Sequence, residues 1–177
     1  MSEQVQAQSF SVRAAALRRA AVFVELGKPR ILALVLVVTS IGFALASRGS
    51  TQASLAALLH TLLGTALVAA GANALNQFLE AKFDAQMLRT QDRPVPSGRL
   101  TRLECLAFGV VCGVSGLLYL AIQTNPLTFL VAGITIVSYV LLYTPLKRRS
   151  SMCVYVGAVP GALPPLIGWA AGAGSLD

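Results

Sequence analysis

GSTQASLAALLHTLLGTALVAAGANALNQFL, residues 49–79, is a run of 31 residues without a formal charge, and it leads directly into EAKFDAQMLRTQDR, residues 80–93. About 20 apolar residues are enough to cross the hydrocarbon core of a bilayer as a helix. The run therefore predicts a membrane-spanning helix over about residues 53–79. That helix delivers a segment rich in carboxylates and bases to a membrane surface.

The composition of the whole chain indicates a membrane protein. Hydrophobic residues make up 55% of the sequence, charged residues only 12%, and the mean hydropathy is +0.70, which is far too apolar for an ordinary soluble domain. The net charge of +7 does not predict nucleic-acid binding, because the basic residues fall between apolar spans rather than in one patch. The three cysteines lack CxxC spacing, so neither a zinc site nor a disulfide framework is predicted.

Uncharged runs on either side of this helix predict four further spans, which makes the fold class all-α and polytopic. The 42-residue uncharged run from Cys105 to Leu146 is too long for one helix, and the turn at residues 123–126 divides it. Three prolines should kink or break the last span. The expected spans are 27–47, 53–79, 104–122, 127–146 and 153–174. Residues 1–22 are expected to form a flexible tail without a cleaved signal that leads into an interfacial helix, and residues 23–177 a single membrane domain.

The loop charges predict the orientation of these spans. Five bases precede the first span, five lie in residues 80–104, and three follow the fourth span, so 13 of the 14 lysines and arginines fall on one side of a five-span threading. Loops rich in lysine and arginine stay in the cytoplasm. The N-terminus and the segment around residues 76–93 are therefore expected on the cytoplasmic face of a bacterial inner membrane.

Asn76, Glu80 and Asp84 recur every four residues at the end of the second span. If the helix continues through them, their side chains lie within about 80° of one another on one face. Oxygen donors of this kind suit Mg²⁺, which prefers one or two carboxylates together with phosphate oxygens. Arg89 and Arg93 follow, as a site for a metal-bound diphosphate would require. A solvated helix end that merely needs polar groups is the competing interpretation.

A second polar group, Tyr143 to Arg149, lies on the same expected face. Lys147 is able to contact a diphosphate as a point charge, and Tyr143 is able to donate its hydroxyl. Taken alone, the segment is better explained as a positive-inside anchor with an interfacial tyrosine. The lone His60, at the opposite end of the second span, is explained better as a hydrogen-bonded helix residue than as a haem ligand.

These motifs resemble those of the UbiA superfamily of intramembrane prenyltransferases. The resemblance is carried by Asn76-x3-Glu80-x3-Asp84 with Arg89-Thr90 and Arg93-Pro94, by Gly27-Lys28-Pro29-Arg30, by Tyr143-Thr144-Pro145-Leu146-Lys147-Arg148 and by the run from Gly161 to Trp169. It extends from about residue 24 to the end. The run around Pro164-Pro165 and Gly168-Trp169 points to the branch of the superfamily that farnesylates haem.

The resemblance implies a bundle of about nine helices with two acidic motifs that bind Mg²⁺ and a prenyl diphosphate on the cytoplasmic side. By this resemblance Asn76, Glu80 and Asp84 are the first metal and catalytic motif. The implied diphosphate contacts are Arg89, Arg93, Tyr143, Lys147 and Arg148. The implied reaction transfers farnesyl from farnesyl diphosphate to a vinyl group of haem b, giving haem O.

Two departures from the family pattern matter. Glu80 stands where many members have aspartate, and the sequence holds no second acidic motif. We therefore expect an N-terminal part of such an enzyme, inactive alone because it lacks the C-terminal half of the fold. Two other functions stay open: a related prenyltransferase acting on a quinone precursor or a chlorophyll-type acceptor, and a noncatalytic membrane remnant or assembly partner.

Overall fold

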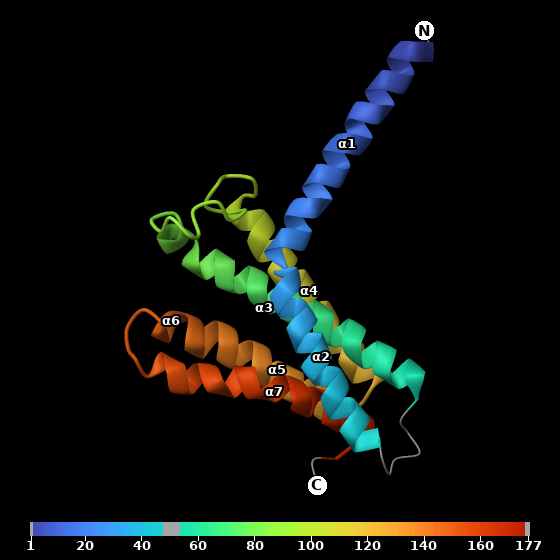
Figure 1. The fold of residues 1–177 in the computed structure, drawn as a ribbon, viewed down its shortest axis with the longest axis vertical. Coiled ribbons are helices and arrows are strands. Elements are labelled where there is room, and N and C mark those ends of the chain that lie inside the picture. The colour runs from blue at the N-terminus through green and yellow to red at the C-terminus, as the bar shows by residue number, and fades with distance from the viewer. Residues whose placement is uncertain (1, 48–53, 176–177) are drawn as a thin grey trace.

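The structure, a computed structural model, describes residues 2–47 and 54–175, and these form helices joined by turns, without a strand (Figure 1). Five segments of this part are long and apolar enough to cross a membrane. The predicted all-α class with five spans is therefore confirmed. The elements in order are α1 (Ser2–Leu26), α2 (Pro29–Ala46), α3 (Leu55–Asp84), α4 (Arg102–Gln123), α5 (Pro126–Val137), the π-helix η2 (Ser138–Tyr143), α6 (Thr144–Leu146) and α7 (Cys153–Ala173).

The N-terminal segment is helical from Ser2 onward, whereas the sequence predicts a flexible tail that leads into an interfacial helix. Helix α1 runs without interruption from Ser2 to Leu26, and its N-terminal part stands away from the bundle (Figure 1). Its last turns pack on α3 and α4, where Leu26 is fully buried and the Phe23 ring lies 5.2 Å from that of Phe108. Leu17 and Val24 on it are 71% and 62% exposed. The first break in the chain falls at Gly27-Lys28, after the predicted boundary.

Helix α3 is longer than the predicted span and carries the acidic segment. The Ser54 side chain caps its first turn by accepting from the Ala57 amide at 3.1 Å. At the other end the helix continues past Leu79 to Asp84, through glutamate, alanine and lysine, which favour helix. Because the helix continues through Asp84, the side chains of Asn76, Glu80 and Asp84 lie on one face of α3. These three residues are called the stripe below.

Glycines let the helices of the bundle approach closely. A Cβ atom on Gly71 of α3 would lie 2.5 Å from the Gly113 amide nitrogen of α4. Between α2 and α7 the approach is closer still, because a Cβ on Gly42 would overlap the Pro165 carbonyl oxygen and one on Gly168 the Thr39 carbonyl oxygen. Such close packing of backbones replaces the hydrophobic effect as the force between membrane helices.

The three prolines of the last span do not break it. Helix α7 runs continuously from Cys153 to Ala173 with Pro160, Pro164 and Pro165 inside it. Of the two predicted effects, a kink or a break, the break is therefore absent. Neighbouring helices make such prolines tolerable in membrane proteins, and here Pro164 is buried within the bundle.

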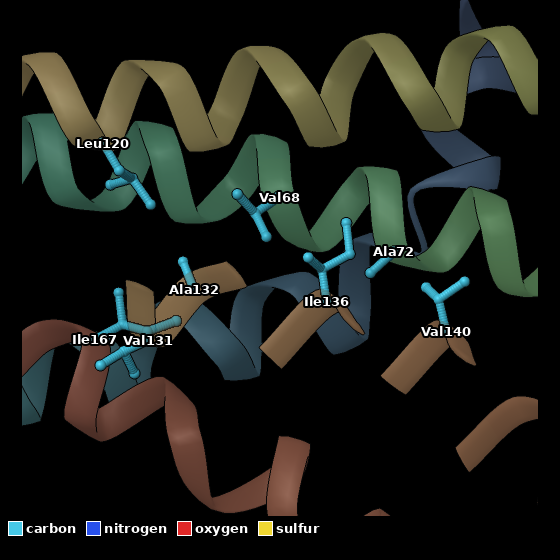
Figure 2. Packing of buried hydrophobic residues seen from close by; sticks show 8 residues of the cluster. All are labelled: Val68, Ala72, Leu120, Val131, Ala132, Ile136, Val140 and Ile167. Carbon is cyan, nitrogen blue, oxygen red and sulfur yellow. The ribbon is translucent and has the colours of Figure 1, made fainter. Parts of the chain in front are cut away.

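The main apolar core lies between the α3–α4 pair and the α5–α7 pair (Figure 2). Leu120 and Ala132 are fully buried in it, and Ile167 of α7 is 2% exposed. The cluster comprises Val68, Ala72, Leu120, Val131, Ala132, Ile136, Val140 and Ile167. This core fixes α3 against the fourth and fifth spans, which bring the second polar segment to the end of α3.

The fourth span changes its winding near its C-terminal end. After α5 the chain forms the π-helical turn η2 over Ser138–Tyr143 and then the short α6 with Pro145 in its first turn. Proline has no amide hydrogen and its ring crowds the carbonyl four residues earlier. A π-turn relieves both problems. The Thr144 hydroxyl then donates to the Tyr139 carbonyl oxygen, five residues back, at 2.8 Å.

The basic segment between α3 and α4 is a chain of turns. Arg99 anchors it by a two-pronged pair with Glu25 of α1, at 2.6 and 2.8 Å. This pairing raises the pKa of Arg99 above its ordinary value. The segment ends where Thr101 and Glu104 form a capping box at the start of α4. The turns therefore have a fixed path past the end of α3.

Candidate functional site

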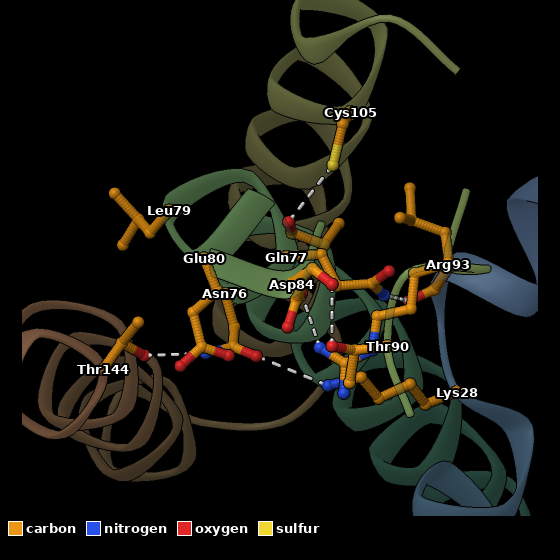
Figure 3. A network of polar contacts seen from close by, with 12 residues as sticks. Lys28, Asn76, Gln77, Leu79, Glu80, Asp84, Thr90, Arg93, Cys105 and Thr144 are labelled. Atoms are coloured by element: carbon orange, nitrogen blue, oxygen red, sulfur yellow. Dashed lines mark hydrogen bonds and ion pairs between the residues drawn. The ribbon is translucent and has the colours of Figure 1, made fainter. Parts of the chain in front are cut away.

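The stripe predicted on α3 is present and is buried. Asn76, Glu80 and Asp84 are 3%, 5% and 4% exposed, and their side chains gather at the end of α3 between the fourth span and the basic turns (Figure 3). Buried carboxylates need partners, since an unpaired buried charge is costly. The partners come from three separate segments of the chain.

Lys147, just after α6, supplies the partner of Glu80. Its ammonium nitrogen lies 3.1 Å from Oε1 and 3.5 Å from Oε2 of that carboxylate. The Glu80 side chain is 6% exposed and that of Lys147 is 44% exposed. The lysine therefore reaches from the surface to a buried acid.

Arg93 supplies the partner of Asp84. It lies in the run of turns between α3 and α4, residues 85–101, which are called the basic turns here. Its Nη1 donates to Oδ2 of the aspartate at 2.6 Å. Thr90 fixes the same turn, because its hydroxyl donates to the Asp84 carbonyl oxygen at 3.0 Å. Hydrogen bonds to a charged group are the stronger class, so the turn holds the guanidinium over the end of the stripe.

Asn76 joins two segments with the two ends of its amide. Its Nδ2 donates to the Thr144 hydroxyl oxygen at 3.1 Å, and its Oδ1 accepts from the Lys28 ammonium group at 3.4 Å (Figure 3). The π-turn before Thr144 directs this hydroxyl to the stripe. The α1–α2 junction supplies Lys28.

Lys28 is held in an unusual position. Its backbone is left-handed, with φ 55° and ψ 70°, immediately before Pro29. Burial, and to a smaller extent the nearby positive charge of Arg93, lowers the pKa of its ammonium group to about 8. Lys28, Arg93 and Lys147 thus place three positive charges around the two negative charges of Glu80 and Asp84. An excess of positive charge favours binding of an anion.

Not every predicted site residue reaches this group. Arg89 is exposed and makes neither a hydrogen bond nor an ion pair within the part of the chain that the structure describes. Arg148 packs along the outside of α3, where its guanidinium lies 3.7 Å from the Phe83 ring centroid and donates to the Leu79 carbonyl oxygen at 3.0 Å. Tyr143 faces the cavity described next instead of the stripe.

An apolar cavity of about 740 Å³ opens beside the stripe. Asn73, one turn before Asn76 on α3, and Tyr143, next to Thr144, both line it. The remaining lining is largely aliphatic and comes from α2, α3, α5, η2 and α7. Its volume is typical of a ligand site. A ligand with an anionic head and an apolar tail fits this arrangement, with the head at the charged stripe and the tail in the cavity.

Two residues at this site were missed from the sequence, Lys28 and Thr144. Lys28 belongs to the motif Gly27-Lys28-Pro29-Arg30, and a lysine directly before a helix-starting proline was the signal that could have singled it out. Thr144 carried no signal of its own, because its role depends on the π-turn. The lone His60 is hydrogen bonded as expected, with its Nδ1 2.7 Å from the Tyr119 hydroxyl oxygen.

The donor chemistry of the stripe fits Mg²⁺ when a ligand shares the ion. Two carboxylates and an amide oxygen are hard donors of the kind that Mg²⁺ accepts. Among the described residues there is no group of three or more His, Cys, Asp or Glu side chains that could hold a metal ion alone. The protein therefore offers part of a coordination shell, which phosphate oxygens would have to complete.

Together these features define an all-helical, polytopic membrane protein with a charged site at the mouth of an apolar cavity. Residues 35–177 match the model of the UbiA prenyltransferase family, and the chain belongs to that family. The resemblance inferred from the motifs is confirmed.

Relatives with known names match over most of this chain. A protoheme IX farnesyltransferase of Anaeromyxobacter sp. (strain Fw109-5) is 46% identical over 169 residues, covering 96% of this chain and 56% of that protein. The mitochondrial protoheme IX farnesyltransferase of Homo sapiens is 41% identical over 156 residues, covering 88% of this chain and 34% of that protein. The chain spans about half the length, or less, of the curated relatives it matches.

A solved structure confirms the fold. It comes from work on the biosynthesis of digeranylgeranylglyceryl phosphate synthase in membranes, and it superposes with a TM-score of 0.77 at 20% sequence identity. The match covers 88% of this chain and 54% of that one. At this identity the likeness concerns the helical architecture alone.

Proposed function

We propose that this chain forms the farnesyl diphosphate half-site of a protohaem IX farnesyltransferase, which transfers the farnesyl group to a vinyl group of haem b and so makes haem O. The observation that carries the proposal is the buried stripe Asn76, Glu80 and Asp84 with Arg93 and Lys147 against it, at the mouth of an apolar cavity. The names of the relatives supply the acceptor.

In this proposal each part of the site has one task. Asn76, Glu80 and Asp84 would hold Mg²⁺, which would supply positive charge to the leaving diphosphate. Arg93 and Lys147 bind diphosphate oxygens and stabilise the negative charge that grows as the bond to the allylic carbon breaks. The apolar cavity holds the farnesyl chain and keeps water from the farnesyl cation until that cation bonds to the vinyl carbon. Water then adds to the cation left on the acceptor, supplies the new hydroxyl and loses a proton, while diphosphate is the leaving group.

The relatives are nearly twice as long as this chain or longer, which supports a larger site in the complete enzyme. A second acidic motif and the remaining helices would complete the metal and haem sites. We place the stripe on the cytoplasmic side of a bacterial inner membrane, because 13 of the 14 lysines and arginines fall on that side of the five spans.

A chimera tests this function directly. This chain replaces the matching part of the Anaeromyxobacter relative, and the product is incubated in membranes with Mg²⁺, farnesyl diphosphate and haem b. We expect haem O, detected by chromatography and mass spectrometry, and its loss on Glu80→Gln or Asp84→Asn. The matched control is Lys82→Met, an exposed residue of the same helical turn.

Two results would overturn the proposal. One is a folded chimera that makes no haem O while the parent relative does. The other is haem O formation that is indifferent to both carboxylate substitutions. Prenylation of a quinone precursor in place of haem b would move the chain to another branch of the family.

A further inference from the structure

Lys28 differs from the other two cations of the site in lacking a carboxylate partner. Within the described residues, Glu80 pairs with Lys147 and Asp84 with Arg93. The Lys28 ammonium group instead donates to the neutral amide oxygen of Asn76, at 3.4 Å. A half-buried cation without a carboxylate in direct contact is costly, and the position of Lys28 is explained if a ligand brings a further negative charge.

The backbone conformation of Lys28 is strained. A residue before proline favours extended conformations, and a left-handed conformation costs about 1 to 2 kcal/mol for a residue other than glycine. Lys28 has φ 55° and precedes Pro29. Strained residues of this kind persist only where surrounding contacts enforce them, and such positions cluster at functional sites.

Two amides on α3 provide that enforcement. Gln77 Nε2 donates to the Leu26 carbonyl oxygen at 2.8 Å, and Asn73 Nδ2 donates to the Gly27 carbonyl oxygen at 3.0 Å. Both amides are buried, at 1% and 5% exposure. They satisfy carbonyls at the end of α1 that the broken helix leaves without a partner. The junction is thereby fixed to the same helix that carries the acidic stripe.

We propose that Lys28 is a ligand of the substrate diphosphate, and that Asn73 and Gln77 are positioning residues that hold it beside the stripe. This inference rests on the proposed function. It adds a third cation, from the α1–α2 junction, to Arg93 in the basic turns and to Lys147 just after α6. A lysine that only anchored the protein to lipid headgroups would extend into solvent, whereas this side chain lies against Asn76 (Figure 3).

Binding measurements on the 177-residue chain in phosphatidylcholine nanodiscs with Mg²⁺ test the role of Lys28. Radiolabelled farnesyl diphosphate is the probe, farnesol is the uncharged comparison, and empty nanodiscs correct for partitioning. One charge-assisted hydrogen bond corresponds to about tenfold to a hundredfold in affinity. We expect Lys28→Met to weaken farnesyl diphosphate binding by that factor and to leave farnesol binding unchanged. The control Lys82→Met should change neither.

A double-substitution cycle tests the positioning residues. We expect Gln77→Leu to weaken farnesyl diphosphate binding about as much as Lys28→Met does, by about tenfold to a hundredfold. In the Gln77→Leu background, Lys28→Met should add almost nothing, since the lysine has already lost its position. A purely structural role of Gln77 predicts instead that the two effects multiply. Asn73→Leu should behave as Gln77→Leu does.

The outcomes separate this inference from the proposed function. Equal binding of farnesyl diphosphate by the unsubstituted chain and by Lys28→Met overturns the role of Lys28 and leaves the proposed function standing. If Lys28→Met loses binding of both farnesol and farnesyl diphosphate, the substitution has damaged the fold, and the role of Lys28 as a diphosphate ligand is likewise overturned. Failure of the unsubstituted chain to bind farnesyl diphosphate counts against the proposed function, and the inference falls with it.

Discussion

The ammonium group of Lys147 lies 3.1 Å from the carboxylate of Glu80, a residue 67 positions earlier in the chain. The pair joins the end of the second span to the end of the fourth. Only the carboxylate is buried, since 44% of the lysine side chain is exposed. The cost of losing one partner is therefore unequal for the two residues.

Replacing Lys147 with methionine should lower stability and weaken diphosphate binding together. The substitution leaves the buried Glu80 carboxylate without a donor, which costs about 1 to 2 kcal/mol after allowing for the exposure of the lysine. The stability is measured by thermal denaturation in detergent, with circular dichroism as the probe of unfolding. Adding Glu80→Gln should restore much of the stability but none of the binding. A double variant as unstable as Lys147→Met would contradict this account.

The stripe on α3 and the five spans were predictable because both depend on local periodicity. Four-residue spacing and uncharged runs are properties of a single helix. The position of Lys28 was not predictable in this way. Local rules expect an extended residue before Pro29, and the observed left-handed turn is imposed by amides 46 and 51 residues from the carbonyls that they bind.

Local sequence rules also could not distinguish Arg93 from Arg89. Both arginines follow the stripe in the sequence, but only Arg93 reaches Asp84. The turn that selects it depends on the hydrogen bond from Thr90 to the Asp84 carbonyl oxygen. The prediction of two equivalent arginine contacts could not include this geometry, because a run of turns has no period from which side-chain direction follows.

Arg93 and Arg99 lie in one set of turns, and their ion pairs should differ in strength. Asp84, the partner of Arg93, has a side chain that is 6% exposed, whereas that of Glu25, the partner of Arg99, is 47% exposed. We expect Arg93→Met to cost about 2 to 3 kcal/mol and Arg99→Met less than about 1 kcal/mol. Thermal denaturation of both variants provides the comparison. Equal costs would mean that the burial of Asp84 is unimportant.

Gly168 should tolerate no side chain, while Gly161 on the same helix should tolerate one. A Cβ atom on Gly168 would overlap the Thr39 carbonyl oxygen of α2, and one on Gly161 would meet nothing within 4 Å. We expect Gly168→Ala to destabilise the protein by about 1 to 3 kcal/mol, because α2 and α7 must move apart. Gly161→Ala should be neutral or slightly stabilising. Denaturation midpoints in detergent would show the contrast, and a neutral Gly168→Ala would refute the close contact.

Pro145 should matter for the site more than for stability. Its missing amide hydrogen and its ring account for the π-turn over Ser138–Tyr143, and that turn directs Thr144 to Asn76. With Pro145→Ala an ordinary α-helix becomes accessible, which would rotate Thr144 and Lys147 away from the stripe. We expect weaker farnesyl diphosphate binding with unchanged or higher thermal stability. The control is Pro126→Ala, which changes the first position of α5 at the opposite end of the same span and should leave binding intact. Unchanged binding in Pro145→Ala would show that the π-turn persists without the proline, and its cause would then lie in the packing of α7 against η2.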